Sequence, residues 1–174
     1  MKAKRARKKA RKPARKAPTL ALVVEDEGWK QNPATLKLIR RAARLALDHQ
    51  PCGGRTLTIL LSGDERLRQL NRQFRRKDTP TNVLSFVSRD PLYWGDVAIA
   101  LGVAEREARA QGKTLPAHAA HLTVHGILHL KGYDHAKASD RIAMEGAETL
   151  ILSKLGLPDP YAPRPYTRTA KAVN

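Results

Sequence analysis

Three histidines in the last third of the chain have a spacing that could hold a metal ion. His125 and His129 are four residues apart, so on one helix their rings would project from the same face. Gly132 then permits a left-handed backbone conformation, and the resulting turn could bring His135 back toward the first two rings. Three imidazoles that leave one coordination position open are typical of a catalytic zinc site, whereas structural zinc usually has four protein ligands. The spacing therefore predicts one zinc ion bound by these three histidines.

Neighbouring polar residues each allow two interpretations. His121 lies one helical turn before His125, where it could support the metal site or contact a substrate; an ordinary core or surface histidine is the other interpretation. Asp134 could accept the free N–H of a ligand histidine, or it could cap the last helix. We interpret His49 and His118 as structural or solvent-facing.

The same spacing, His-x-x-x-His-x-x-Gly-x-x-His, ends the signature of the metzincin zinc peptidases. Those enzymes carry a glutamate directly after the first histidine, where it acts as the general base in peptide hydrolysis. Here that position is Gly126, so the pattern argues against a protease. Met144 lies downstream, where metzincins place a methionine beneath the metal, although a lone methionine in an apolar helix is more often part of the core.

The charge of the chain suggests a polyanionic partner. The net charge is +17 over 174 residues, and nucleic acid is the commonest cytosolic polyanion. Residues 1–18 contain ten lysines and arginines and no acidic residue, so the remainder carries about +7. We interpret this segment as a basic disordered arm that contacts RNA or the ribosome through phosphate groups, or alternatively as a solubilising extension.

Cysteine usage and hydropathy bear on the compartment. Cys52 is the single cysteine, which excludes an intramolecular disulfide and a cysteine zinc cluster and fits a reducing compartment. No apolar run approaches the ~20 residues needed to span a bilayer, and the run at 20–24 is too short for a signal-peptide core of about 7–15 residues. We therefore expect a cytoplasmic protein that does not bind a membrane.

Strands and helices alternate along the chain, and together they must position the histidines. Apolar runs predict strands at 20–24, 56–61, 83–87 and 96–101, and helical periodicity predicts helices that begin at Pro33 and after residue 65, then at 103–111, 116–131 and 137–155. The helix after residue 65 would turn Leu67, Leu70 and Phe74 inward. The last helix would turn Ile142, Leu150, Ile151 and Leu155 inward.

This pattern predicts a small α/β or α+β domain in which helices cover one sheet. We place that domain at residues 19–157, between the basic arm at 1–18 and a flexible proline-rich tail at 158–174. The strand order cannot be read from the pattern.

Three blocks of sequence resemble one known family. The segment from His125 to His135, HGILHLKGYDH, resembles the signature of the YbeY family of bacterial endoribonucleases and rRNA maturation factors. The block LNRQFRRKDTPTNVLSF, residues 70–86, looks like the family's other hallmark, and GDVAI, residues 95–99, fits between the two. The resemblance covers roughly residues 20–156, with the blocks in the same order as in the family.

The resemblance implies a metzincin-like α+β fold, with a small mixed sheet covered by helices and a three-histidine zinc site. It implies cleavage of single-stranded RNA, a part in 16S rRNA 3′-end maturation and ribosome quality control, and partners in the small ribosomal subunit and its assembly proteins. Arg75 matches the arginine that the family requires for function. This chain departs from the family at Val87, where a proline is common, and in its basic arm and proline-rich tail.

These residues suggest how RNA would be cleaved. Zinc would lower the pKa of water toward ~7, and Arg75 would hold the scissile phosphate and offset charge in the transition state. Arg76 and Lys77 would add phosphate affinity, with His121 as a further candidate for substrate contact. No general base is evident. The alternative function is a non-catalytic rRNA- or ribosome-binding assembly factor with a structural metal.

Overall fold

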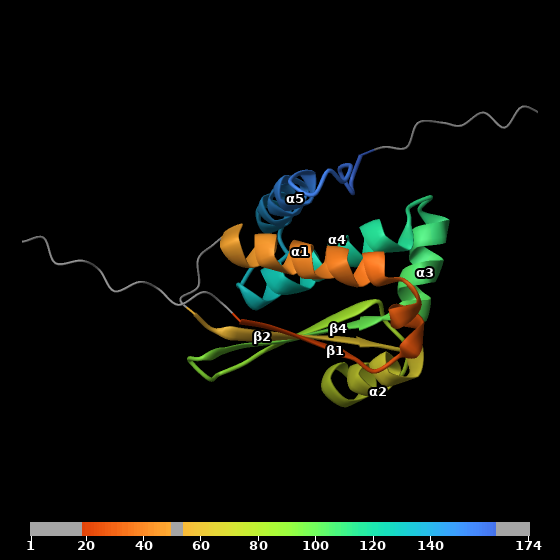
Figure 1. Cartoon of the computed structure of the whole chain (residues 1–174). Helices are drawn as coiled ribbons and strands as arrows, with labels where there is room; N and C mark the ends of the chain where they lie inside the picture. Colours follow the sequence, from red (N-terminus) through yellow and green to blue (C-terminus); the bar gives the residue numbers. More distant parts are fainter. Residues whose placement is uncertain (1–18, 50–53, 163–174) are drawn as a thin grey trace, which may run out of the picture.

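The computed structural model describes residues 19–49 and 54–162, which form a four-stranded mixed sheet covered by helices (Figure 1). This architecture confirms the α+β expectation. The expected basic arm at 1–18 and residues 163–174 of the expected tail lie outside the described residues. The elements are β1 (Thr19–Val24), the 3-10 helix η1 (Glu27–Gln31), α1 (Pro33–His49), β2 (Thr56–Ser62), α2 (Asp64–Arg75), β3 (Val83–Val87), β4 (Tyr93–Ala100), α3 (Leu101–Ala110), α4 (Leu115–Leu130) and α5 (Ala138–Ser153).

The sheet has the strand order β1-β2-β4-β3. β1, β2 and β4 are parallel, and β3 pairs with β4 in the antiparallel sense. β3 is therefore an edge strand, with one side hydrogen-bonded to β4 and the other side unpaired within the sheet. This edge lies beside α4, the helix that carries most of the histidines.

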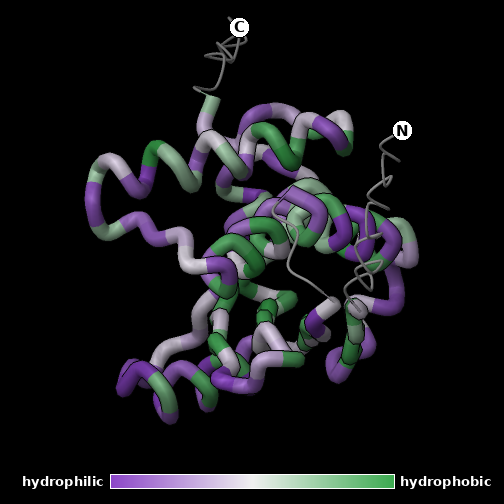
Figure 2. Tube along the Cα trace, turned by 90° about the vertical axis from the view of Figure 1, so that its left-hand side faces the viewer, coloured by the Kyte–Doolittle hydropathy of each residue, from purple (hydrophilic) through white to green (hydrophobic). Residues whose placement is uncertain are grey.

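The two faces of the sheet have different partners. Leu57, Ile59 and Leu61 of β2 are fully buried against α1 and α4, which lie side by side on one face (Figure 1). Figure 2 shows hydrophobic segments concentrated where the strands meet this helical layer. α2 lies on the opposite face, where Leu67 packs with Leu84 in a second, smaller cluster. The main core is therefore the layer that fixes the position of α4.

The sequence predicted the start and the end of α4 correctly. Thr114 caps the helix by accepting a hydrogen bond from the backbone N–H of Ala117. The helix ends at Leu130, and Gly132 adopts a left-handed conformation with φ of 88°. Most of α4 is buried between α1, α3, α5 and the sheet, so these neighbours fix the position of the helix.

The predicted inner face of α5 was partly wrong. Ile142 and Leu150 are 68% and 49% exposed. The buried stripe of this helix instead includes Met144, Glu148 and Ile151, which recur at the spacing of one helical face. The prediction placed bulky aliphatic residues in the core and excluded the charged Glu148 from it. The predicted stripe was therefore rotated around the helix axis from the observed one.

α2 shows a similar departure. Leu67 is fully buried and Leu70 half-buried, as predicted, but Phe74 is 57% exposed and packs only edge-on against Phe86. Asn71 is buried in its place, because this turn of the helix faces the loop that follows.

Among the described residues, no helix is long and apolar enough to cross a membrane.

Candidate metal centre

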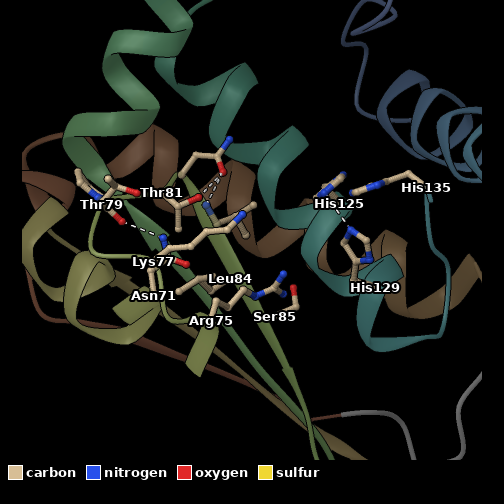
Figure 3. A pocket seen from close by; sticks show the side chains of 13 residues that line it. Asn71, Arg75, Lys77, Thr79, Thr81, Leu84, Ser85, His125, His129 and His135 are labelled. Atoms are coloured by element: carbon tan, nitrogen blue, oxygen red, sulfur yellow. Dashed lines mark hydrogen bonds between the residues drawn. The ribbon is translucent and has the colours of Figure 1, made fainter. Parts of the chain in front are cut away.

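The three histidines at 125, 129 and 135 lie together at the C-terminal end of α4. One ring nitrogen from each lies within 4.8 Å of the other two. His125 and His129 project from successive turns of the helix, and the turn at Gly132 brings His135 back toward them (Figure 3). The ring centroids of His129 and His135 are 5.0 Å apart, and those of His125 and His135 are 5.8 Å apart. Three imidazoles arranged in this way could hold one metal ion.

Hydrogen bonds fix which nitrogen of His125 and of His129 faces the centre. His129 Nδ1 lies 3.0 Å from the carbonyl oxygen of Tyr133, and His125 Nδ1 lies 2.8 Å from Glu148 Oε1. Both partners are acceptors, so both Nδ1 atoms donate and each neutral ring keeps its lone pair on Nε2.

The two Nε2 atoms of His125 and His129 are 3.1 Å apart. Two lone pairs at this separation repel each other unless a cation lies between them. Tetrahedral zinc with Zn–N bonds of about 2.0–2.1 Å would place two ligand nitrogens about 3.3 Å apart. The donors present therefore suit a zinc ion in both type and spacing.

The protonation of His129 is consistent with metal binding. Burial lowers the pKa of His129, and the neighbouring His125 and His135 lower it further. The ring therefore stays neutral at physiological pH, as a metal ligand must. Asp134 accepts a hydrogen bond from the backbone N–H of His135 at 2.7 Å, and this bond lowers the pKa of the Asp134 carboxyl. Asp134 thus stabilises the turn that carries the third ring and does not cap the last helix, whose N-cap position is Lys137, without a capping hydrogen bond from its side chain.

A buried carboxylate lies directly behind the centre. Glu148 of α5 is 0% exposed and accepts hydrogen bonds from His125, His121 and the hydroxyl of Tyr161. Burial alone would raise the pKa of Glu148, but the bonds from the two histidines outweigh it and lower the pKa to about 2. Burial and the Glu148 carboxylate raise the pKa of Tyr161, which keeps its hydroxyl a donor.

The centre opens onto a cleft of about 390 Å³ between α2, β3 and α4 (Figure 3). None of the described residues that line it is acidic, and Arg75 and Lys77 are its cationic side chains. Such a lining favours an anionic ligand. The lining residues are Asn71, Arg75, Lys77, Thr79, Pro80, Thr81, Asn82, Val83, Leu84, Ser85, His125, His129 and His135.

Some of the predicted substrate-binding residues line the cleft and others do not. Arg75 and Lys77 line the cleft with the three histidines, whereas Arg76 between them does not. Arg76 adopts a left-handed conformation with φ of 57° as it ends α2, and this reverses the direction of the chain. His121 also lies outside the cleft and bonds Glu148 on the far side of the rings.

Two asparagines hold the loop that forms one wall of the cleft. Asn71 is 4% exposed and donates to the carbonyl of Thr79 at 2.8 Å. Asn82 donates to both carboxylate oxygens of Glu107, at 3.1 and 3.0 Å, and its own side chain accepts from Val83 N. The segment between these anchors is thereby fixed at both ends. Sequence reasoning identified neither residue.

Gly126 occupies a position where a larger residue would not fit. A Cβ atom there would lie 2.5 Å from Val97 Cγ1 and 3.1 Å from Ser85 Oγ. Ser85 also donates from Oγ to the carbonyl of Gly126 at 3.0 Å, which joins β3 to α4. The glycine therefore allows close contact between the helix and the sheet, and a glutamate at this position is excluded by the packing.

A second cavity, of about 280 Å³, lies on the α5 side of the rings. His125 and His135 line it together with Met144, Glu148 and Tyr161. Met144 is 2% exposed, so it belongs to the core and also lies close to the centre.

Sequence reasoning missed Glu148, although a signal was present. Met144, Glu148 and Ile151 share one helical face, and an acid in an otherwise apolar stripe needs hydrogen-bonding partners. Histidines on a neighbouring helix are suitable donors. Tyr161 offered no comparable signal, because it follows the last helix.

A family model and individual relatives agree on one family. The family model described as Endoribonuclease YbeY matches residues 24–156. A protein named Endoribonuclease YbeY from Rhodopseudomonas palustris is 42% identical over 155 residues, which cover 83% of this chain and 82% of that protein. A protein of the same name from Stutzerimonas stutzeri is 48% identical over 130 residues, covering 71% and 81%. The solution structure of TM1509 from Thermotoga maritima shares the fold, with a TM-score of 0.54 and 22% identity over 83% of this chain and all of that chain.

Proposed function

Because this chain belongs to the YbeY family of endoribonucleases, we propose that it is a zinc-dependent endoribonuclease that cleaves single-stranded RNA. The observation that carries the proposal is the position of the histidine cluster. The three rings form one end of a cleft whose described lining is cationic and free of carboxylates. A peptidase would need a carboxylate general base beside the first histidine, and the packing around Gly126 leaves no room for one.

The residues of the cleft have separable roles. A zinc ion held by the three histidines would supply Lewis acidity and would lower the pKa of water toward about 7. Arg75 would bind the phosphate through two N–H groups and offset the negative charge that develops as the new bond to phosphorus forms. Lys77 would add affinity for a neighbouring phosphate without selecting a base. The hydrogen bonds of Asn71 and Asn82 would hold the loop, and so limit how far these cations can move.

Several finer roles belong to the same proposal. We propose that the RNA is rRNA, with a part in 16S 3′-end maturation and ribosome quality control, and that the protein acts on the small ribosomal subunit with its assembly proteins. We propose that this rRNA processing takes place in the cytoplasm. We also propose a metzincin-like relationship for the fold, which is supported by the spacing of the histidines and by Met144 close to them.

The second candidate is a non-catalytic assembly factor with a structural metal. Against it, the cluster offers three protein ligands among the described residues, whereas structural zinc usually has four. Cleavage of RNA separates the two candidates, because the assembly factor would bind RNA and leave it intact.

The test is single-turnover cleavage of a single-stranded RNA by the purified full chain, with and without a chelator. We expect cleavage to stop in the chelator and to return when zinc is added back. Cleavage that persists in the chelator would contradict the proposal. Arg75→Glu should reduce cleavage by at least ~10³-fold while zinc content is unchanged, in line with the loss of a phosphate-stabilising arginine.

Arg76→Glu is the matched control, because it makes the same charge change one residue away and outside the cleft. We expect it to reduce cleavage by no more than about ten-fold, the scale of losing one phosphate contact in the surrounding field. Equal losses in both variants would show that overall charge, not the position of Arg75, controls the reaction.

A further inference from the structure

We propose that Glu148 and Tyr161 are positioning residues of the metal centre: together they hold His125 in the orientation and tautomer that present Nε2 to the ion. The inference rests on the proposed metal binding and extends it to residues that lie outside the cleft. It also assigns a role to the segment after the last helix, where Tyr161 is located.

Glu148 is buried in a stripe of α5 that is otherwise apolar. Its side chain is fully buried, and a buried carboxylate is strongly destabilising unless its oxygens are paired. Three donors satisfy it, since Oε1 accepts from His125 and Oε2 accepts from His121 and Tyr161. An apolar residue would suit this stripe of α5 better for stability alone. The acid is therefore best explained by what it does to the histidines.

His125 and His121 offer different ring nitrogens to Glu148. His125 offers Nδ1 at 2.8 Å and so leaves Nε2 facing His129. His121, one turn earlier on the same helix, offers Nε2 at 2.8 Å. One carboxylate thus holds two neighbouring rings in opposite tautomers. This explains why His121 does not join the cluster, because its Nε2 is committed to Glu148.

Tyr161 contacts both Glu148 and His121. Its hydroxyl donates to Glu148, and its ring packs edge-on against His121 with centroids 5.6 Å apart. Asp159 ties this segment to α5, because its Oδ1 accepts from Thr149 Oγ1 and from Tyr161 N, each at 3.0 Å. The tyrosine is therefore held over the carboxylate by its own turn. Its hydroxyl restricts Glu148 to the orientation in which Oε1 faces His125.

The test measures zinc affinity by competition with a chromophoric chelator. Glu148→Gln keeps the shape of the side chain and removes its charge. We expect a 10- to 100-fold weaker affinity, the range typical for losing the partner of a metal-binding histidine. Tyr161→Phe should weaken binding by a few-fold. Because Tyr161 is 43% exposed, this variant should fold normally.

Glu107→Gln is the matched control. Glu107 accepts a hydrogen bond at 2.8 Å from His118, which lies on α4 as His125 does but is not part of the cluster. We expect the zinc affinity of this variant to stay within two-fold of the wild-type value. Equal losses in the Glu107 and Glu148 variants would overturn the proposal, because they would indicate general destabilisation.

The second measurement needs no metal. In metal-free protein at a pH where the rings are neutral, the ¹⁵N chemical shifts of labelled histidine report the tautomer of each ring. We expect His125 to be almost entirely in the Nδ1–H form in the wild type and to become a mixture in Glu148→Leu, which removes both acceptor oxygens. An unchanged His125 tautomer in that variant would overturn the proposal, even if zinc affinity fell.

The two measurements also separate this inference from the proposed function. If the wild-type protein does not bind zinc, the proposed metal site fails, yet the tautomer of His125 still tests the role of Glu148. If the wild type binds zinc and the Glu148 and Tyr161 variants bind it equally well, the metal site stands and the positioning role is wrong.

Discussion

The two halves of α4 each place a histidine 2.8 Å from a glutamate, but only one half contributes to the candidate metal centre. In the N-terminal half, His118 is 2% exposed and bonds Glu107 through Nε2. Its Nδ1 is buried and has no hydrogen-bond partner among the described residues. In the C-terminal half, the side chain of His125 is 25% exposed and its Nε2 faces His129.

The difference shows that a carboxylate–histidine pair does not by itself indicate a functional site. The pair at His118 serves the architecture, because Glu107 also accepts from Asn82 and thereby joins α3, α4 and the start of β3. The pair at His125 leaves a nitrogen that converges with two others on an accessible space. Convergence and access, rather than the hydrogen bond, distinguish the site.

The largest expected effect compares the two histidines directly. His125→Ala should weaken zinc binding by at least ~100-fold, because two imidazoles cannot replace three. His118→Ala should leave the zinc content unchanged and lower the free energy of unfolding by about 1–3 kcal/mol, since it removes a buried hydrogen bond and leaves a cavity. Metal analysis and urea unfolding of both variants check the prediction. A His118 variant that loses its metal would show that the two halves of α4 are not independent.

A smaller effect concerns the contact that places the C-terminal half of α4 on the sheet. Gly126→Ala should lower the free energy of unfolding by about 1–3 kcal/mol, because the new methyl group overlaps the stiff side chain of Val97. Gly146→Ala is the control, since a Cβ atom there would meet nothing within 4 Å. That helical substitution should stabilise the protein by about 0.5–1 kcal/mol. Equal effects in the two variants would contradict the close packing at Gly126.

The smallest expected effect is a pH dependence of the free energy of unfolding that arises from His118, in the N-terminal half of α4. Burial lowers the pKa of His118 below its ordinary value of 6.5, although Glu107 opposes the shift; His121 and Lys113 reinforce it. In the unfolded chain His118 therefore binds a proton near pH 6.5, whereas in the folded chain it binds that proton only at lower pH. The stabilisation is complete above pH 6.5 and is lost as the pH falls through the folded-state pKa, with a slope of at most about 1.4 kcal/mol per pH unit.

Urea unfolding of metal-free protein at several pH values below 7 tests this prediction. His118→Gln cannot titrate, so its stability should change less over this range than that of the wild type. Parallel curves for the two proteins would show that His118 does not contribute.

Much of this architecture follows from local patterns in the sequence. β3 was predicted with the bounds observed, and α4 to within one residue at each end, because capping residues, apolar periodicity and Gly132 all act over a few residues. The grouping of His125, His129 and His135 follows from the same short-range geometry. The strand order depends on how distant segments pack, and the left-handed turn at Arg76 lacks the glycine that usually marks such a helix end, so the sequence pattern indicated neither.

The errors have a common physical cause. Ile142 and Phe74 were assigned to the interior because they are hydrophobic, while Glu148 and Asn71 were not considered for it because they are polar. Both buried polar residues bond groups elsewhere in the chain, namely His125 and the carbonyl of Thr79. A buried polar side chain is stable only with such partners, and these are known once the fold is known.

The position of Tyr161, beyond the last helix, has a consequence for synthesis on the ribosome. Chains emerge from the N-terminus, so the sheet and α4 can form before the residue that orients Glu148 has left the exit tunnel. If Tyr161 positions Glu148 as proposed, a nascent chain would acquire its full affinity for metal only after Tyr161 has emerged. The proposed nuclease would therefore stay below full activity until Tyr161 has emerged, which would limit early cleavage of the RNA that surrounds the nascent chain.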